Sequence, residues 1–232
     1  MKPTNEDLEW TNTIESIDVD AYIEEPSRRD YDQYYDEFKS AGLTRDLFDR
    51  MYPLLYQSVW STFALFKLAK SVKRSGIIAE IGSAKGGSLI TMFLANPTCV
   101  YYCIDPFEPY NAISLDSIQE NRVFSNFLAA SYETFLKNIE PFSVNKIIVK
   151  LKSDEAITQL QNIKFDMIFI DGCHEYEYVK RDIQNYKLLL NDNGILCGHD
   201  FHPRFNGVIK AVKECIDGYF VIQRSSIWVT LY

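Results

Sequence analysis

The sequence has no long apolar run, no C-x-x-C cysteine pair and no excess of positive charge. Among its 232 residues no apolar run reaches the roughly 18 residues of a membrane span, and Met1 is followed by charged and polar residues instead of an apolar signal segment. The five cysteines form an odd set without the spacing of a zinc site or a disulfide framework. These absences disfavour a secreted or membrane protein and predict a cytoplasmic one.

The acidic charge is concentrated at the N-terminus, which disfavours nucleic acid as a partner. Residues 1–37 hold twelve Asp and Glu against three Lys and Arg, so the other residues are close to neutral although the chain carries −8. No basic surface is left for a phosphate backbone. We predict an acidic arm with a short helix over residues 1–40 and a single domain over 41–232. The arm could serve as a lid or as a contact in a homo-oligomer.

Apolar runs alternate with amphipathic segments from Ile77 onward, a pattern typical of a Rossmann-like, doubly wound α/β fold. A longer helix from Pro53 to about Lys73 precedes the first strand, and covering the sheet is its expected role. The two last strands read as an antiparallel hairpin joined by Arg224-Ser225-Ser226, which predicts a mostly parallel seven-stranded sheet with N-terminal helices. The predicted strands are Ile77–Ile81, Val100–Asp105, Lys146–Leu151, Met167–Asp171, Gly194–His199, Tyr219–Gln223 and Ile227–Leu231, and the helices between them are Gly87–Ala95, Ile118–Asn138, Asp154–Asn162, Glu175–Leu190 and Val208–Ile216.

The segment Ile77–Ser88 joins a buried strand to a helix through a glycine-bearing turn. At such a corner the glycines let the backbone approach a ligand, and the helix N-terminus offers free N–H groups. The spacing Glu80-x-Gly82-x-x-x-Gly86-Gly87 differs from the G-x-G-x-x-G of dinucleotide enzymes. A pyrophosphate would be repelled by the Glu80 carboxylate, whereas the ammonium of an amino-acid moiety would be attracted. The turn therefore favours a nucleoside that carries an amino acid.

An acid follows each of the first five predicted strands. In an open α/β sheet ligands bind beyond the carboxyl ends of the strands, so these acids are expected to meet at one edge. A single Asp in such a place is often just a turn residue, but five consecutive strand ends favour a functional site. The three histidines of the chain follow the fourth and fifth strands. The residues concerned are Glu80, Asp105, Asp154, Asp171 and Asp200, with His174, His199 and His202.

Asp105 has the position of a ribose-binding acid. It lies 18 residues after Gly87, close to the roughly 20-residue interval seen in nucleotide-binding folds. A carboxylate offers two acceptor oxygens to the two hydroxyls of a ribose, and it would repel a 2′-phosphate. We therefore expect a ribose with both hydroxyls free.

Four motifs in order complete the pattern, and together they resemble class I S-adenosylmethionine-dependent methyltransferases. The resemblance is greatest to the small-molecule and sugar O-methyltransferases of the macrocin type, and it extends from about Val59 to the C-terminus. The motifs are Glu80-Ile-Gly82-Ser-Ala-Lys-Gly86-Gly87-Ser88, Ile104-Asp105-Pro106, Phe169-Ile170-Asp171-Gly172-x-His174-x-Tyr176-x-x-Val179-x-x-Asp182 and Gly198-His199-Asp200.

The resemblance implies a role for each matched position. Glu80 and the turn with Gly82, Ser83, Gly86, Gly87 and Ser88 would contact the methionine part of S-adenosylmethionine. Asp105 would hold the ribose, Ser153 and Asp154 the adenine, and Asp171 would lie at the floor of the active site. The expected reaction is transfer of a methyl group to a hydroxyl of a small molecule, such as a sugar or glycoconjugate precursor.

Two routes could remove the proton of the acceptor hydroxyl. In one, Asp171 and Asp200 hold Mg²⁺, which lowers the pKa of the bound hydroxyl. In the other, His174 or His199 is the general base. Metal-dependent relatives usually carry two adjacent acids, or Asp-Asn, after the fifth strand, whereas this chain has His199-Asp200, and imidazole is a poor Mg²⁺ ligand. Both routes stay open on the sequence.

Two other functions share the fold. An NAD-binding oxidoreductase would also use a ribose acid, but the missing G-x-G-x-x-G disfavours it. A non-catalytic relative would keep the fold as an interaction module, but it would have no need of acids at the strand ends. We further expect Glu175, Glu177 and Asp182 to lie on the solvent face of the helix after the fourth strand. His202 and Arg204 are expected either to meet the substrate or to belong to a surface loop.

Overall fold

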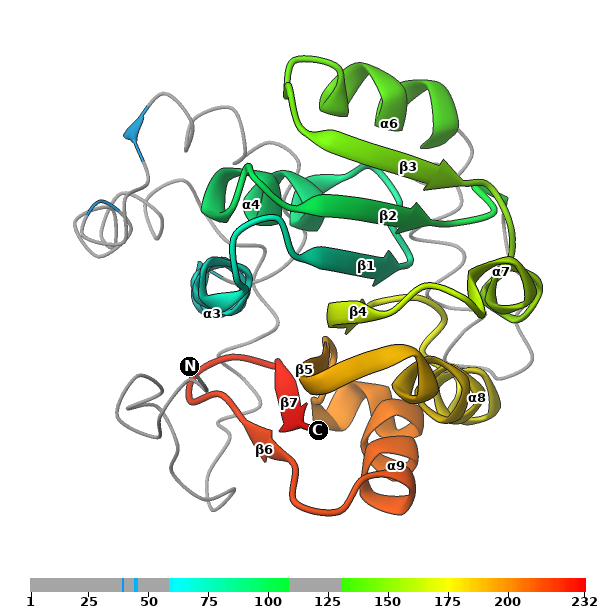
Figure 1. The fold of residues 1–232 in the computed structure, drawn as a ribbon. Coiled ribbons are helices and arrows are strands. Elements are labelled where there is room, and N and C mark those ends of the chain that lie inside the picture. The colour runs from blue at the N-terminus through cyan, green and yellow to red at the C-terminus, as the bar shows by residue number, and fades with distance from the viewer. Residues whose placement is uncertain (1–38, 40–43, 46–58, 109–130) are drawn as a thin grey trace.

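The computed structural model describes residue 39, residues 44–45, residues 59–108 and residues 131–232 (Figure 1). Apart from residue 39, the predicted acidic arm and its short helix lie outside the described residues. So do the predicted helical residues 118–130 and the first part of the helix expected from Pro53. None of the described helices is both long and apolar enough to cross a lipid bilayer.

The described strands form one seven-stranded sheet in the order β3-β2-β1-β4-β5-β7-β6. The first five strands are parallel, whereas β7 runs antiparallel to β5 and β6 antiparallel to β7. The predicted Rossmann-like sheet with an antiparallel C-terminal hairpin is confirmed. The strands are β1 (Ile77–Ile81), β2 (Val100–Ile104), β3 (Asn145–Val149), β4 (Phe165–Ile170), β5 (Leu190–Gly198), β6 (Phe220–Val221) and β7 (Trp228–Leu231).

Helices cover both faces of the sheet because successive residues of the buried strands point to opposite sides. Ile78 packs in the core on one side, and Ala79 in the core on the other. The first core is covered by α3 (Val59–Ser71), α4 (Gly87–Ala95) and α6 (Ser131–Ile139), as Figure 1 shows. The second is covered by α7 (Ser153–Leu160), α8 (Tyr176–Tyr186) and α9 (Asn206–Cys215). Two short 3₁₀ turns, η3 (Lys187–Leu189) and η4 (Pro203–Phe205), flank β5. The part of the long predicted helix that is described therefore has the expected covering role.

Strand β5 begins at Leu190, four residues before the predicted start. The polar residues at its beginning do interrupt the pairing, because Phe165 pairs with Leu190 but Met167 already pairs with Ile195. The intervening residues form an irregularity in which Asn193 has a φ of 64°. The polar residues between Leu190 and Gly194 therefore make a bulge within the strand.

The prediction for Asp182 is wrong. Asp182 is 4% exposed and lies on the inner face of α8, together with Val179, Ile183 and Tyr186. Glu177 is exposed, as expected, and Glu175 is half-buried just before the helix. Positions 179, 182, 183 and 186 follow the helical spacing of a buried face, so this spacing was the signal for Asp182.

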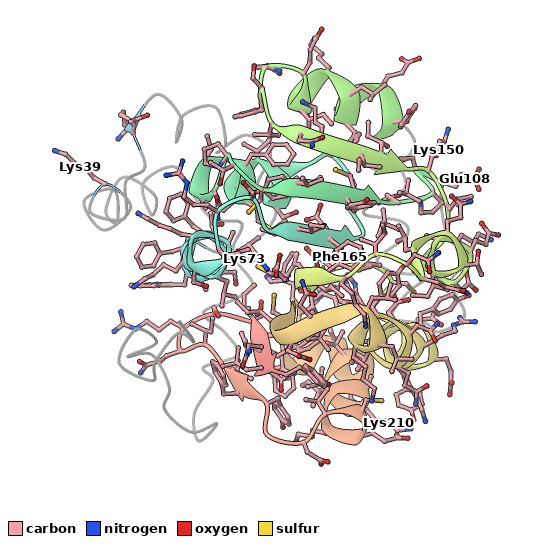
Figure 2. The ribbon with its side chains drawn as sticks, in the orientation of Figure 1. Lys39, Lys73, Glu108, Lys150, Phe165 and Lys210 are labelled. Atoms are coloured by element: carbon pink, nitrogen blue, oxygen red, sulfur yellow. The ribbon has the colours of Figure 1, made fainter. Side chains whose placement is uncertain are left out.

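The parallel strands place their carboxyl ends along one edge of the sheet. Figure 2 shows Glu108 and Lys150 beyond the ends of β2 and β3, which marks this edge, and Phe165 at the start of β4. Lys73, at the opposite edge, forms an ion pair of 2.8 Å with Asp166. The predicted site residues all lie at or beyond the carboxyl edge.

Candidate cofactor and acceptor site

The turn after β1 is held open by two glycines in left-handed conformations. Gly82 has a φ of 92° and Gly86 a φ of 86°, values that side-chain-bearing residues rarely adopt. Gly86 precedes the first residue of α4, so the free N–H groups of that helix face the carboxyl edge. Gly87 and Ser88 form the first turn of α4, as the sequence predicts.

Glu80 is fully buried at the end of β1 and is only partly satisfied. The Ser88 hydroxyl donates a hydrogen bond to its Oε1. Ser83 lies close enough to favour the ionised carboxylate, but among the described residues neither Glu80 Oε2 nor Ser83 Oγ reaches a hydrogen-bond partner. Burial, with the nearby charges of Asp171 and Asp105, raises the pKa of Glu80 to about 8. A ligand with a positively charged donor would satisfy this carboxyl group.

Asp105 follows β2 and is held in place by two backbone donors. Its Oδ2 accepts from the N–H of Ala84 at 2.8 Å, and its Oδ1 accepts from the N–H of Phe107 at 2.6 Å. Burial raises the pKa of Asp105, and these two hydrogen bonds counteract the rise. Each oxygen keeps a further lone pair, so the fixed carboxylate can still accept from two adjacent hydroxyls.

Ser153 and Asp154 begin α7 at the same edge. These are the two residues that the resemblance to methyltransferases places at the adenine. The Ser153 carbonyl accepts a hydrogen bond of 2.9 Å from the Tyr186 hydroxyl, and its side chain is hydrogen-bonded to Asp182. Burial raises the pKa of Asp182 to about 7. Asp154 is more exposed and lies 3.5 Å from Arg181. Asp182 and Tyr186 of α8, for which the sequence predicts no such role, therefore fix the start of α7.

The ends of β4 and β5 bring Asp171, His174, His199 and Asp200 together. His174 Nε2 lies 2.8 Å from Asp200 Oδ2. His199 Nδ1 lies 3.1 Å from Asp200 Oδ1 and 3.6 Å from Asp171 Oδ1. The Phe205 ring packs on the imidazole of His174, with ring centroids 4.6 Å apart. Two acids and two imidazoles thus form one partly buried cluster, in agreement with the grouping expected from the strand ends.

The pKa values of the two acids in this cluster are shifted in opposite directions. Asp171 has its pKa raised to about 6 by burial, which the charge of His199 opposes. The pKa of Asp200 is held far below its usual range, because the attraction of His199 and His174 outweighs its burial. The same two carboxylates raise the pKa of His199 against its burial. Asp200 is therefore harder to protonate than Asp171.

The cluster also has the composition of a metal site. The ligand atoms of Asp171, His174 and Asp200 lie within 4.8 Å of one another. Two carboxylates and one imidazole fit a divalent ion that accepts nitrogen, such as Mn²⁺ or Zn²⁺, better than Mg²⁺, which favours oxygen ligands. The predicted pair Asp171 and Asp200 is thus brought together, and His174 joins it.

Two further polar residues at the cluster were not anticipated from the sequence. The Ser226 hydroxyl, between β6 and β7, lies 2.8 Å from His199 Nε2, and the Ser61 hydroxyl of α3 lies 3.4 Å from that of Ser226. His202, by contrast, caps η4 by accepting from the Arg204 N–H at 3.2 Å. His202 is only 6% exposed, so the surface-loop interpretation fits the exposed Arg204 but not His202.

The backbone at the end of β1 is in direct contact with the residue that follows β4 and with the end of β2. The N–H of Asp171 donates to the carbonyl of Ile81, and the N–H of Gly82 donates to the carbonyl of Ile104, both at 2.8 Å. The turn after β1 therefore lies against the ends of both β2 and β4. A ligand bound along this turn would extend from Asp105 to Asp171, next to the histidine cluster.

Fold and site together define a class I, Rossmann-like methyltransferase. A sequence model of the family described as "Methyltransferase domain" matches residues 79–201, which is more than half of the 232 residues. The chain belongs to this family. No curated protein sequence gives a significant match.

Solved structures with the same fold include two methyltransferases and one further cofactor-bound protein. The O-methyltransferase NovP is 13% identical with a TM-score of 0.60, over 75% of this chain and 80% of its own. The calicheamicin methyltransferase CalS11 is 14% identical with a TM-score of 0.56, over 96% and 99%. The cofactor-bound protein Rv0187 from MTB is 15% identical with a TM-score of 0.55, over 90% and 98%. At these identities the likeness establishes the fold.

Proposed function

We propose that this protein is an S-adenosylmethionine-dependent methyltransferase that methylates a hydroxyl group of a small molecule. The observation that carries the proposal is the contact between two unlike halves of one edge. On one side of Gly82 lies a buried, half-satisfied carboxyl group, Glu80, with the fixed acceptor Asp105. On the other side lies the cluster of His174 and Asp200. One half suits a nucleoside with an ammonium group, and the other suits removal of a proton.

The residues of the turn would bind and orient the cofactor. Glu80 and Ser83 would receive the ammonium of its methionine part, and Asp105 would accept from both ribose hydroxyls. Ser153 and Asp154 would contact the adenine. When bound, S-adenosylmethionine supplies an electrophilic methyl group on a sulfonium.

The cluster would align the acceptor and take its proton. We assign the general base to His174, because its Nε2 is paired at 2.8 Å with the carboxylate of Asp200. Such a pair orients an imidazole and stabilises the positive charge it gains. The Phe205 ring packs on the His174 imidazole and shields one side of it. In-line displacement needs little more from the protein than this alignment and this proton acceptor.

A metal-assisted route is the second candidate. It is favoured by the mutual approach of Asp171, His174 and Asp200 within 4.8 Å. The three residues would hold a divalent ion that acidifies the acceptor hydroxyl. The two routes give His174 different roles, so chelation separates them: a base would work without metal, whereas a ligand would not.

The acceptor is proposed from the relatives alone. NovP is an O-methyltransferase, and CalS11 is a TDP-rhamnose 3′-O-methyltransferase in calicheamicin biosynthesis. A hydroxylated small molecule, such as a sugar or glycoconjugate precursor, is therefore the substrate class to try first. A soluble cytoplasmic protein without nucleic-acid partners is consistent with this chemistry.

Ligand binding tests the proposal directly. S-adenosylhomocysteine should raise the melting temperature and bind in calorimetry, and a hundredfold excess over Kd should stabilise the fold by about 2.7 kcal/mol. NAD is the matched control for the rival oxidoreductase. A response to NAD with none to S-adenosylhomocysteine would overturn the proposal, and no response to either would favour a non-catalytic module.

A further inference from the structure

Ser226 uses every polar group it has to join three separate segments. Its hydroxyl lies 2.8 Å from His199 Nε2, and its carbonyl accepts from the N–H of Phe201 at 3.0 Å. Its own N–H donates to the Ser61 hydroxyl at 3.3 Å. Ser226 is 4% exposed and Ser61 is fully buried, so these contacts are sheltered from water. The turn before β7 is thereby tied to α3 and to the residues after β5.

The two contacts with the segment after β5 lie on either side of Asp200. Asp200 has a φ of 58°, a left-handed conformation that costs free energy for a residue with a side chain. Such a conformation persists only where the neighbours hold it. His199 and Phe201, the residues directly before and after it, are the two that Ser226 holds. Ser226 therefore holds the residues on both sides of Asp200.

Within the same turn, Ser225 has the opposite role. Its hydroxyl donates to the Ile222 carbonyl at 2.8 Å and accepts from the Ile227 N–H at 3.1 Å. Both contacts lie inside the turn between β6 and β7, and Ser225 is also 4% exposed. The Ser225 hydroxyl thus closes the turn, whereas the Ser226 hydroxyl forms a hydrogen bond with His199. The two adjacent serines differ in what they touch but not in burial.

Ser226, His199 and Asp200 are arranged as in the triad of a serine hydrolase. The Ser226 hydroxyl lies at His199 Nε2, and the Asp200 carboxylate lies at His199 Nδ1. A nucleophile must reach its substrate, however, and Ser226 is 4% exposed, in contact with Ser61. Its N–H is also used within the protein. Burial of this kind excludes attack on an acyl donor and leaves an orienting role.

We propose that Ser226 is a positioning residue for the acceptor site, which fixes the His199 ring so that its Nδ1–H faces Asp171 and Asp200. Carboxylate oxygens lie near Nδ1, so the proton of a neutral ring is expected on Nδ1, and Nε2 then accepts from the Ser226 hydroxyl. A charged ring keeps the Nδ1 proton and donates to the same hydroxyl from Nε2. His199 Nδ1 lies 3.1 Å from Asp200 and 3.6 Å from Asp171. One ring thereby holds the two carboxylates side by side.

This inference builds on the proposed function by dividing the work of the two histidines. A ring whose two nitrogens both contact protein groups has no nitrogen left for an acceptor hydroxyl. His199 is then a support, and the general base or metal ligand is His174. The turn of the antiparallel hairpin, where β6 ends and β7 begins, consequently contributes to the site.

Nitrogen-15 spectra of the histidine rings test the tether without any substrate. Only three histidines are present, so His199 can be assigned from single variants of His174 and His202. We expect a protonated Nδ1 at His199 in the wild type, with its proton sheltered from exchange. In Ser226→Ala this proton signal should be lost, and in Ser226→Thr, which keeps the hydroxyl, it should return.

Ser225→Ala is the matched control, because it removes an equally buried hydroxyl from the same turn. It should lower the melting temperature and leave the His199 signals in place. A bare Nδ1 at His199 in the wild type would overturn the inference, even if Ser226→Ala failed to fold. Unchanged His199 signals in a folded Ser226→Ala would overturn it too. Binding of S-adenosylhomocysteine, measured separately on the wild type, decides the proposed function independently of these spectra.

Discussion

A Cβ atom placed on Gly82 would lie 2.2 Å from the carbonyl oxygen of Asp171. The end of β1 and the end of β4 are therefore in backbone contact at the centre of the carboxyl edge. The absence of a side chain at Gly82 lets the turn after β1 lie directly against Asp171 and Gly172. The two halves of the proposed reaction meet at this contact.

Replacing Gly82 by alanine should damage both halves at once. The new methyl group would clash with backbone atoms, and a φ of 92° is strained for alanine. We expect a loss of roughly 2–4 kcal/mol in the free energy of unfolding, measured by denaturant titration, and no binding of S-adenosylhomocysteine. Gly218→Ala is a matched control, because Gly218 also has a positive φ but nothing within 4 Å of its Cβ position. Equal losses in both variants would contradict the role given to the contact.

Replacing Asp105 by alanine should weaken cofactor binding more than it weakens the fold. The variant loses two charge-assisted hydrogen bonds to the ribose, each worth about 1.5–3 kcal/mol, so we expect affinity for S-adenosylhomocysteine to fall at least tenfold in calorimetry. Asp105→Asn tests the charge. Its amide can accept with only one oxygen, and its NH₂ group would face the N–H of Ala84 or of Phe107. An unchanged affinity in Asp105→Ala would remove Asp105 from the site.

Binding of the cofactor should release a proton from Glu80. The pKa of Glu80 is about 8, so at pH 7 the carboxyl group is mostly protonated. An ammonium group beside it lowers that pKa and favours the carboxylate. Calorimetry at pH 7 in buffers of different ionisation enthalpy should show this release, and affinity should rise as the pH approaches 8. Glu80→Gln should bind more weakly without releasing a proton. Proton uptake in the wild type would contradict the assignment.

Stability should fall as the pH rises from about 4 to about 7, because of Asp182. Its pKa in the folded protein is raised from 3.8 to about 7, so between these values the folded state binds more protons than the unfolded state. The stabilisation is complete below 3.8 and is lost as the pH rises to the folded pKa. Melting temperatures across this window should decline less steeply in Asp182→Asn, in which the group at this position cannot ionise. An identical slope in the variant would show that other groups cause the decline.

Much of the sheet could be predicted because its strands are short, apolar and bounded by turn residues. Strand β1 and helix α4 have the predicted limits, and the other strands of the parallel part differ mainly at their ends. The clustering of Asp171, His174, His199 and Asp200 also follows from the sequence, because parallel strands bring their carboxyl ends to one edge. Topology alone was sufficient for these parts.

The supporting contacts could not be predicted in the same way. Ser61 and Ser226 are separated by 165 residues, and their meeting depends on how α3 and the last hairpin pack. No local pattern distinguishes Ser226 from Ser225, although one contacts His199 and the other closes a turn. The burial of Asp182 did have a local signal, the spacing of α8, but an acid in a charged helix suggested the opposite face.

The reversed direction of β7 separates the end of the chain from the site. Strand β7 starts next to Ser226 at the carboxyl edge and runs back, so that the Tyr232 N–H donates to the Gly194 carbonyl at 3.1 Å, in the middle of β5. In Figure 1 the C-terminus lies at the tip of β7. A fluorophore, an affinity tag or a surface anchor attached after Tyr232 would therefore project from the opposite edge of the sheet. Immobilised or labelled protein should keep its ligand-facing edge open to solution, which makes this terminus the natural handle for single-molecule or biosensor work.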